Sequence, residues 1–275
     1  DNCIEKEGGF GNVYISKESD YAIKVFKEQM SRDQELNEIY LMKQLNHENI
    51  IKLKGYRLKM DTDTEEYTPY IAMDKYDVNL ESYIIDNSIN IEINIFILLE
   101  IAIGILYLHQ NNIIHRDLKP ENIFLNINKK NKIKKVCLSD LGISRIIHDG
   151  ITKLTTEGKK TPFYAAPELE HIDESKRVFS KETDIYAFGK IIADMFTKVN
   201  HSVVISKKLF KNDILFQLYL ICTQDERKKR ISIEEINQIL ILLLLEEKEI
   251  LNTKEIIYNY VLNKYINDEI PDTII

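Results

Sequence analysis

Cysteine is scarce in this chain of 275 residues. The three cysteines, Cys3, Cys137 and Cys222, are odd in number and lie far apart, and no C-x-x-C pair or Cys/His cluster occurs. Neither a disulfide framework nor a zinc site is therefore indicated. This cysteine usage fits a reducing compartment, so we expect a cytoplasmic protein or the cytosolic domain of a larger one.

Long apolar runs and an excess of basic residues are also missing. The longest apolar run, residues 239–245, is much shorter than the roughly 20 residues that span a membrane, and no signal peptide is visible. The net charge of −7 argues against a general nucleic-acid binder, because phosphate backbones select basic surfaces. We expect no membrane segment and no nucleic-acid partner. Because the first residue is Asp1 rather than Met, we expect a piece of a longer protein.

The most specific stretch spans residues 115–122 and reads H-R-D-L-K-P-E-N without a gap. It resembles the catalytic loop of protein kinases, in which the Asp meets the substrate hydroxyl and the Asn holds a magnesium ion. The resemblance implies catalytic roles for Asp117, Lys119 and Asn122, with Lys119 neutralising the γ-phosphate. A polar turn after a buried helix is the alternative interpretation.

The N-terminal segment, residues 4–26, alternates between apolar and polar residues like paired strands. Within it, residues 6–13 resemble the glycine-rich kinase loop G-x-G-x-x-G-x-V, with Lys6 in place of the first glycine. Glycines let backbone N–H groups approach phosphates closely, but the motif alone is a weak signal because glycine-rich hairpins are common. The resemblance implies ATP contacts from five residues: Gly8, Gly9, Phe10, Gly11 and Val13.

A strand lysine and a helix follow. The sequence Y-A-I-K, which ends at Lys24, resembles the family's V-A-I-K strand and implies ATP contacts from Ala22 and Lys24. Residues 31–34 read as a capping box, after which apolar residues recur at helical spacing. We choose Glu38 on this helix as the ion-pair partner of Lys24, with Glu35 as the alternative. Standing alone, Lys24 would be interpreted as a solvated strand lysine.

Two further strands, residues 50–58 and 67–73, are expected before the point where the family has its gatekeeper and hinge. Asp77 or Asn79 would reach the ribose of the nucleotide. An ordinary core methionine is the alternative interpretation of Met73. The resemblance implies ATP contacts from four more residues: Met73, Asp74, Tyr76 and Phe124.

The C-terminal part begins with residues 94–110, which are apolar almost all round and predict a buried helix. Residues 123–125 and 136–138 read as a hairpin whose turn carries five lysines. We interpret this turn as solvated. A surface for an acidic partner or for regulation is the alternative.

The remaining kinase motifs follow in family order. The stretch S-D-L-G around Asp140 stands where the family has D-F-G, and the resemblance implies that Asp140 and Asn122 bind Mg²⁺. An A-P-E motif ends at Glu168, and Arg230 stands where the family has the arginine that pairs with this glutamate. Asp184 begins the D-x-x-x-x-G stretch of a large buried helix.

The activation segment, residues 140–168, carries several threonines. We predict control by phosphorylation at Thr155 or Thr156. The alternative interpretation is that these threonines are only polar loop residues, with the acidic Glu157 in place of a phosphate. In kinases regulated by phosphorylation an arginine precedes the catalytic Asp, as Arg116 does here, and Arg145 matches a second basic ligand. Two guanidinium groups could bind one phosphate and order the segment.

Together the motifs cover about residues 4–240 and predict an α+β, two-lobed protein-kinase-like fold. Residues 1–73 would form a small β-rich N-lobe and residues 74–245 a larger α-helical C-lobe. Residues 246–275 read as a charged helical tail without an assigned role. The implied function is transfer of the γ-phosphoryl group of ATP, with Mg²⁺, to serine or threonine hydroxyls of a protein substrate. Lys119, two residues after the catalytic Asp, favours the serine/threonine class.

Two alternatives stay open. One is a catalytically weak, kinase-shaped binding or scaffold module, which the departures Lys6, Leu141 and Lys160 favour. Against it, every charged group that the chemistry needs is present. The other is the kinase part of a larger receptor or stress-sensor protein.

The interval between Gly189 and Arg230 looks short for the family, so helices that dock substrate could be trimmed.

Overall fold

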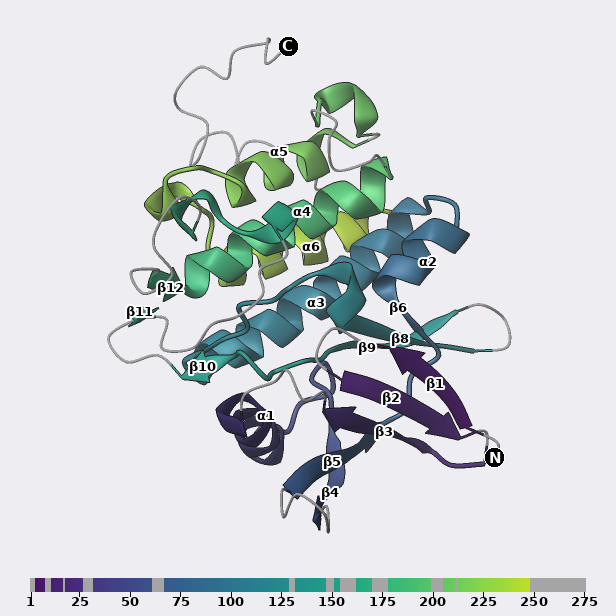
Figure 1. Ribbon diagram of the computed structural model, residues 1–275. Helices are drawn as coiled ribbons and strands as arrows, with labels where there is room; N and C mark the ends of the chain where they lie inside the picture. Colours follow the sequence, from purple (N-terminus) through teal and green to yellow (C-terminus); the bar gives the residue numbers. More distant parts are fainter. Residues whose placement is uncertain are drawn as a thin grey trace.

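The computed structural model describes residues 3–7, 11–16, 18–26, 32–60, 67–128, 132–146, 151–153, 162–169, 178–198, 205–210 and 212–247. These residues form two lobes, a smaller β-rich one and a larger helical one (Figure 1). The predicted two-lobed fold is thus confirmed. Residues 8–10 and most of the tail lie outside the described residues. Residues 154–161, which include Thr155 and Thr156, also lie outside them.

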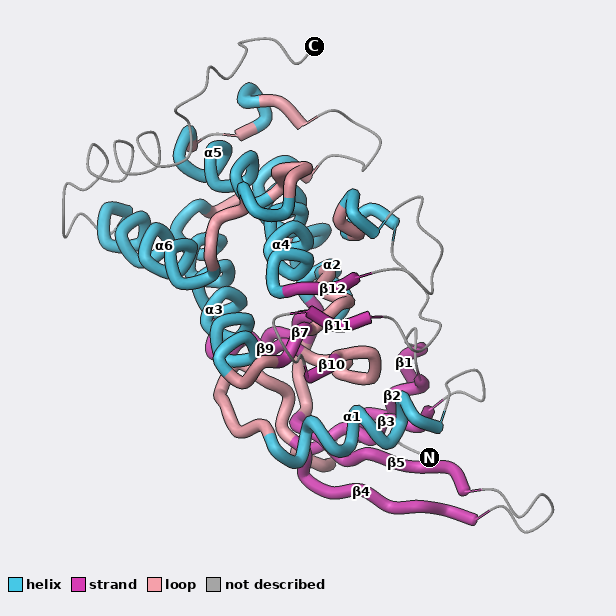
Figure 2. The backbone as a smooth tube through the Cα atoms, turned by 90° about the vertical axis from the view of Figure 1, so that its left-hand side faces the viewer, coloured by secondary structure: helices cyan, strands magenta, loops and turns pink. Residues whose placement is uncertain are grey.

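The N-lobe is a five-stranded antiparallel sheet with the strand order β1-β2-β3-β5-β4. Its one described helix, α1, follows β3 in the chain and lies beside the sheet in both views (Figures 1 and 2). Ile50, expected to start a strand, instead forms an isolated bridge with Leu138 of the other lobe. The element bounds are β1 Cys3–Glu7, β2 Gly11–Ser16, β3 Tyr21–Phe26, α1 Arg32–Gln44, β4 Leu53–Met60 and β5 Tyr67–Asp74.

The C-lobe is built around α3, a 20-residue helix that packs against α6, α4 and β9. The helix begins at Ile91, earlier than predicted, because the Asn90 side chain accepts a hydrogen bond from the Ile93 N–H at 3.0 Å and so caps it. A short helix, α2, was not predicted. The helix bounds are α2 Leu80–Asp86, α3 Ile91–Gln110, α4 Lys181–Thr197, α5 Asp213–Cys222 and α6 Ile233–Glu247.

Short strands and 3₁₀ turns connect these helices. The predicted hairpin is present as β8 and β9 and extends beyond its expected ends, with β6 as the third strand of its sheet. Two further pairs join β7 to β10 and β11 to β12. The strands are β6 Val78–Asn79, β7 Ile113–Ile114, β8 Ile123–Ile127, β9 Ile133–Leu138, β10 Arg145–Ile146, β11 Ile151–Lys153 and β12 Val178–Ser180. The 3₁₀ turns are η1 Pro120–Asn122, η2 Pro162–Tyr164, η3 Pro167–Leu169, η5 Lys207–Leu209 and η6 Arg227–Lys229.

The apolar character of α3 is explained by its place in the core. By length and composition it is the one helix in the described part of the chain that could cross a membrane. In this fold Ile97, Ile101 and Ile105 on α3 are fully buried among other C-lobe side chains. A helix that is apolar all round is expected at such a central position.

Candidate active site

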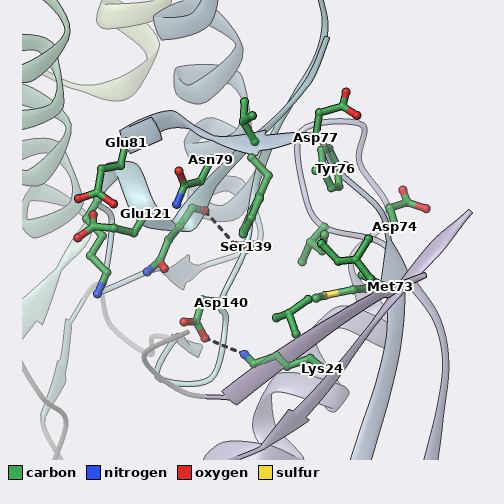
Figure 3. A pocket seen from close by; sticks show the side chains of 18 of the residues that line it. Lys24, Met73, Asp74, Tyr76, Asp77, Asn79, Glu81, Glu121, Ser139 and Asp140 are labelled. Atoms are coloured by element: carbon green, nitrogen blue, oxygen red, sulfur yellow. Dashed lines mark hydrogen bonds and ion pairs between the residues drawn. The ribbon is translucent and has the colours of Figure 1, made fainter. Parts of the chain in front are cut away.

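A cavity of about 380 Å³ lies between the lobes (Figure 3). Strands of the N-lobe sheet form one wall, and η1, β8 and the residues after β9 form the other. Gly8, Gly9 and Phe10 lie outside the described residues, and Gly11 is described only as part of β2. Eleven residues predicted to contact ATP or Mg²⁺, or to act in catalysis, line the cavity: Val13, Ala22, Lys24, Glu38, Met73, Asp74, Tyr76, Lys119, Asn122, Phe124 and Asp140.

A buried ion pair joins the sheet to α1 on one side of the cavity. The Lys24 Nζ lies 2.8 Å from both carboxylate oxygens of Glu38. Glu38, the predicted partner, is therefore paired with Lys24 in the structure. Lys24 also lies 3.1 Å from Asp140 Oδ1 (Figure 3). Burial alone would lower the pKa of Lys24, but Asp140 and Glu38 raise it above its usual value. The ammonium group therefore stays charged although it is buried.

Local structure explains why these side chains meet. Alternate residues of a strand share a face, and Ala22, Lys24 and Phe26 are the buried residues of β3. On α1, Glu38 is 2% exposed and lies one turn before the buried Leu41 and Met42, so it belongs to the face that packs on the sheet.

The loop after β7 is held by a side chain that is distant in sequence. Asp184 of α4, 1% exposed, accepts hydrogen bonds from the backbone N–H groups of His115 and Arg116, both at 2.9 Å. The Nε2 of His109 lies 2.9 Å from the same carboxylate. Arg116 has a φ of 72°, which residues with side chains rarely adopt. Such a conformation needs support from its surroundings, and Asp184 supplies it.

Asp117, Lys119 and Asn122 form a compact cluster on this loop. The Lys119 Nζ lies 2.8 Å from Asp117 Oδ2, and the Asn122 Nδ2 donates to Asp117 Oδ2 at 2.9 Å and to the Asp117 carbonyl at 2.8 Å. Burial raises the pKa of Asp117, and the ammonium group of Lys119 opposes that shift. Lys119 and Asn122 line the cavity, and Asp117 contacts both of them.

Asn122 and Asp140 can supply oxygen ligands from neighbouring strand ends. The Ser139 N–H donates to the Asn122 carbonyl at 2.9 Å, which ties the end of β9 to the start of β8. Both hydrogens of the Asn122 amide nitrogen are directed to Asp117, so the side-chain oxygen is left as an acceptor. An amide oxygen and a carboxylate are ligands that Mg²⁺ prefers. The residues present therefore fit a magnesium ion.

The far end of the cavity is mostly apolar. Met73 is 9% exposed, and the rings of Tyr76 and Phe124 lie 6.0 Å apart between their centroids. The Asp74 carboxylate contacts Lys54 at 2.9 Å and Lys135 at 3.2 Å. Burial would raise the pKa of Asp74, but these two lysines hold it below its usual value.

The two candidate ribose contacts both have structural partners. Asp77 Oδ2 accepts a hydrogen bond from the Ile127 N–H at 2.7 Å, and Asn79 Oδ1 caps α2 by accepting from the Ser82 N–H at 2.9 Å. Both residues line the cavity. A contact of either one with a ribose stays a prediction.

Comparison with known proteins decides the family. The sequence model of the protein kinase domain family matches residues 7–257 of this chain. The chain belongs to the protein kinase family. Relatives of this kinase domain include wall-associated receptor kinase-like 4 of Arabidopsis thaliana, 31% identical over 73% of this chain and 26% of the relative. The meiosis-specific serine/threonine-protein kinase mek1 of Schizosaccharomyces pombe is 30% identical over 67% of this chain and 43% of the relative.

A third relative is calcium-dependent protein kinase 4 of Plasmodium falciparum, 34% identical over 68% of this chain and 35% of the relative. The kinase domain described here thus spans less than half the length of each of these curated relatives. Protein kinase domains generally use ATP and Mg²⁺.

The predicted ion pair of the kinase domain's C-lobe is present. Arg230 Nη1 lies 2.7 Å from Glu168 Oε1, and Arg230 Nη2 lies 2.6 Å from Glu168 Oε2. The Arg230 side chain is fully buried. This bidentate ion pair fixes the end of the activation segment to the segment before α6.

Two arginines of the kinase domain carry the phosphorylation prediction. Burial, followed by the nearby charge of Arg145, lowers the pKa of Arg116 to about 10. The Nε and Nη1 atoms of Arg116 are buried and donate no hydrogen bond within the described residues, and its guanidinium lies 4.1 Å from the centre of the Phe179 ring. A buried cation with unused donors is unfavourable, and a phosphate would satisfy it. Phosphorylation itself stays a prediction.

Proposed function

We propose that this domain transfers the γ-phosphoryl group of ATP to serine or threonine hydroxyls of a protein substrate. One observation supports the proposal most: two charged clusters contribute side chains to the lining of the same cavity. Lys24, Glu38 and Asp140 form one, and Asp117 with Lys119 belongs to the other. Phosphoryl transfer needs little covalent help from the protein, but it needs aligned reactants and neutralised charge. The two clusters supply both.

Each cluster has a separate task. Lys24, fixed by Glu38, would hold the nucleotide phosphates, and Lys119 would neutralise charge on the transferred group. Asp117 would orient the substrate hydroxyl and accept its proton. Its raised pKa makes its carboxylate a better proton acceptor than an exposed aspartate.

Asn122 and Asp140 would hold Mg²⁺ through their side-chain oxygens. A bound magnesium ion neutralises phosphate charge and helps to orient the transferred group. The cavity volume of about 380 Å³ is in the range of small-molecule sites, and its apolar end would receive the adenine. The glycine-rich loop, residues 8–11, would cover the phosphates.

The domain limits and the setting are also proposals. The N-lobe would comprise residues 1–73 and the C-lobe residues 74–245, with residues 246–275 as a tail. Lys119 supports the serine/threonine class. We place the domain in the cytosol, as a cytoplasmic protein or as the cytosolic domain of a larger one, because ATP is available there and thiols stay reduced.

A radiolabelled-ATP assay on a peptide library with Ser, Thr and Tyr acceptors tests this function. We expect label on Ser or Thr peptides, dependent on Mg²⁺, and a loss by orders of magnitude in Asp117→Asn. Equal background labelling by wild type and Asp117→Asn would instead support the non-catalytic module. Label on Tyr peptides alone would show that the serine/threonine class is wrong.

A further inference from the structure

The side-chain amide of Asn37 on α1 contacts the backbone of the segment that follows Asp140. Its Nδ2 lies 2.9 Å from the Ser144 carbonyl oxygen and 3.3 Å from the carbonyl oxygens of both Leu141 and Gly142. An amide nitrogen has only two hydrogens for these three carbonyls, and the contact with Ser144 is the shortest. None of the kinase motifs in the sequence includes Asn37.

The segment that Asn37 contacts contains a strained residue. Asp140 has a φ of 64°, and a residue with a side chain keeps such a conformation only when its surroundings impose it. On the C-lobe side, the His115 Nε2 lies 2.9 Å from the Ser139 carbonyl, and the Ser144 hydroxyl donates to the His115 carbonyl at 3.0 Å. Asn37 supplies an anchor to the same segment from the N-lobe.

This anchor differs from the ion pair beside it. Successive helix residues point about 100° apart, so α1 directs Glu38 to the sheet and Asn37 to the segment after Asp140. Lys24 also reaches Asp140, but in the proposed function Lys24 must serve the nucleotide phosphates as well. The Asn37 bonds are to backbone carbonyls, so the nucleotide does not compete for them.

We propose that Asn37 is a positioning residue that couples the position of α1 to the orientation of the Asp140 carboxylate, and so to Mg²⁺ binding. The inference rests on the proposed function and deepens it. Movement of α1 away from the C-lobe would break the Asn37 bonds together with the Glu38 pair. The phosphate-binding lysine and the magnesium ligand would then be released together.

Two variants and one control separate positioning from folding. Asn37→Ala removes the donor, and alanine has the higher helix propensity, so α1 itself is not weakened. Asn37→Asp has nearly the same shape but places acceptor oxygens against carbonyl oxygens. Gln44→Ala is the matched control, because it removes an exposed side-chain amide from the last residue of the same helix.

The first measurement is hydrogen–deuterium exchange of the Ser144 amide, which donates to the Leu141 carbonyl at 3.1 Å. We expect exchange in the nucleotide-free protein to be several-fold faster in both Asn37 variants and unchanged in Gln44→Ala. The second is the affinity for ADP, by calorimetry, with and without Mg²⁺. We expect the gain in affinity that Mg²⁺ gives to shrink about tenfold in Asn37→Ala and further in Asn37→Asp. Affinity without Mg²⁺ should stay near that of wild type.

Wild-type exchange at Ser144 together with a wild-type magnesium gain in Asn37→Ala would overturn the inference. Faster exchange with an unchanged magnesium gain would also overturn it, because the segment would then be held without any effect on Mg²⁺. If wild type itself showed no magnesium gain, the proposed function would fail and the magnesium part of the inference with it. The exchange data would still show whether Asn37 holds the segment.

Discussion

Replacing Arg230 by alanine should destabilise the C-lobe strongly. Arg230 donates to both carboxylate oxygens of Glu168 and also to the backbone carbonyls of Gln224 at 2.8 Å and Glu182 at 2.9 Å. Its guanidinium lies 5.0 Å from the centre of the Tyr186 ring. Arg230 Nη2 also donates to the Asp225 carbonyl at 3.3 Å, so the variant would leave one carboxylate and three carbonyls without this donor.

The size of the effect follows from burial. The Arg230 side chain is fully buried and that of Glu168 is 21% exposed, so the carboxylate left behind gains only partial contact with water. Removal of one partner of a buried ion pair costs about 3–5 kcal/mol of unfolding free energy. In a domain of this size, each kcal/mol shifts the thermal midpoint by about 2–4 °C, so we expect a decrease of roughly 6–20 °C. Arg230→Lys keeps the charge but cannot make the bidentate contact, so its thermal midpoint should lie between those of wild type and Arg230→Ala.

Thermal and urea unfolding of the purified domain measure this directly. Lys228→Ala is the matched control, because Lys228 is exposed in the same segment, and it should change the unfolding free energy by no more than about 0.5 kcal/mol. The reasoning would be refuted by a midpoint in Arg230→Ala that differs no more from wild type than that of Lys228→Ala.

Three further predictions concern the site and its control. Lys24→Met should lower kcat/KM strongly in the peptide assay, because the phosphates lose their positioning charge; unchanged kinetics would remove Lys24 from the mechanism. Glu38→Lys should have a similar effect through the lost ion pair. Loss of activity in Glu35→Lys with normal activity in Glu38→Lys would show that Glu38 is not the functional partner of Lys24. Mass spectrometry should find phosphate on Thr155 or Thr156, and the double alanine variant should have low activity. Full activity in that variant, or in phosphatase-treated enzyme, would instead indicate constitutive activity.

Much of the site could be predicted because its residues occur in short motifs. The loop that contains Asp117 and Asn122, the strand lysine Lys24 and the S-D-L-G stretch at Asp140 are each recognisable without the fold. The helix pattern of α1 left both Glu35 and Glu38 as partners for Lys24, and the resemblance to the family around Glu38 and Ile39 favoured Glu38, which the structure buries. The division into a β-rich and a helical lobe was implied by the resemblance to protein kinases, and the hydrophobic period of single segments agreed with it.

Other features depend on contacts that no local pattern reveals. Asp184 was expected only to begin a buried helix, yet its carboxylate holds the backbone of His115 and Arg116, 69 and 68 positions earlier. Asn37 lies more than 100 positions from the carbonyls that it contacts. The helix α2 has only seven residues, too few for a periodic signal, and depends on the cap from Asn79. Tertiary packing decides such features, so they became visible only in the fold.

The most direct test of the central claim is a comparison of wild type and Asp117→Asn in single-turnover phosphoryl transfer, with Mg-ATP affinity measured in parallel. Asparagine keeps the shape of Asp117 but cannot accept a proton from the substrate hydroxyl. We predict a rate about 10²–10⁴-fold lower in Asp117→Asn, with an affinity for Mg-ATP close to that of wild type. Equal transfer rates in the two proteins, or a wild type that does not bind Mg-ATP, would contradict the proposed phosphotransferase function.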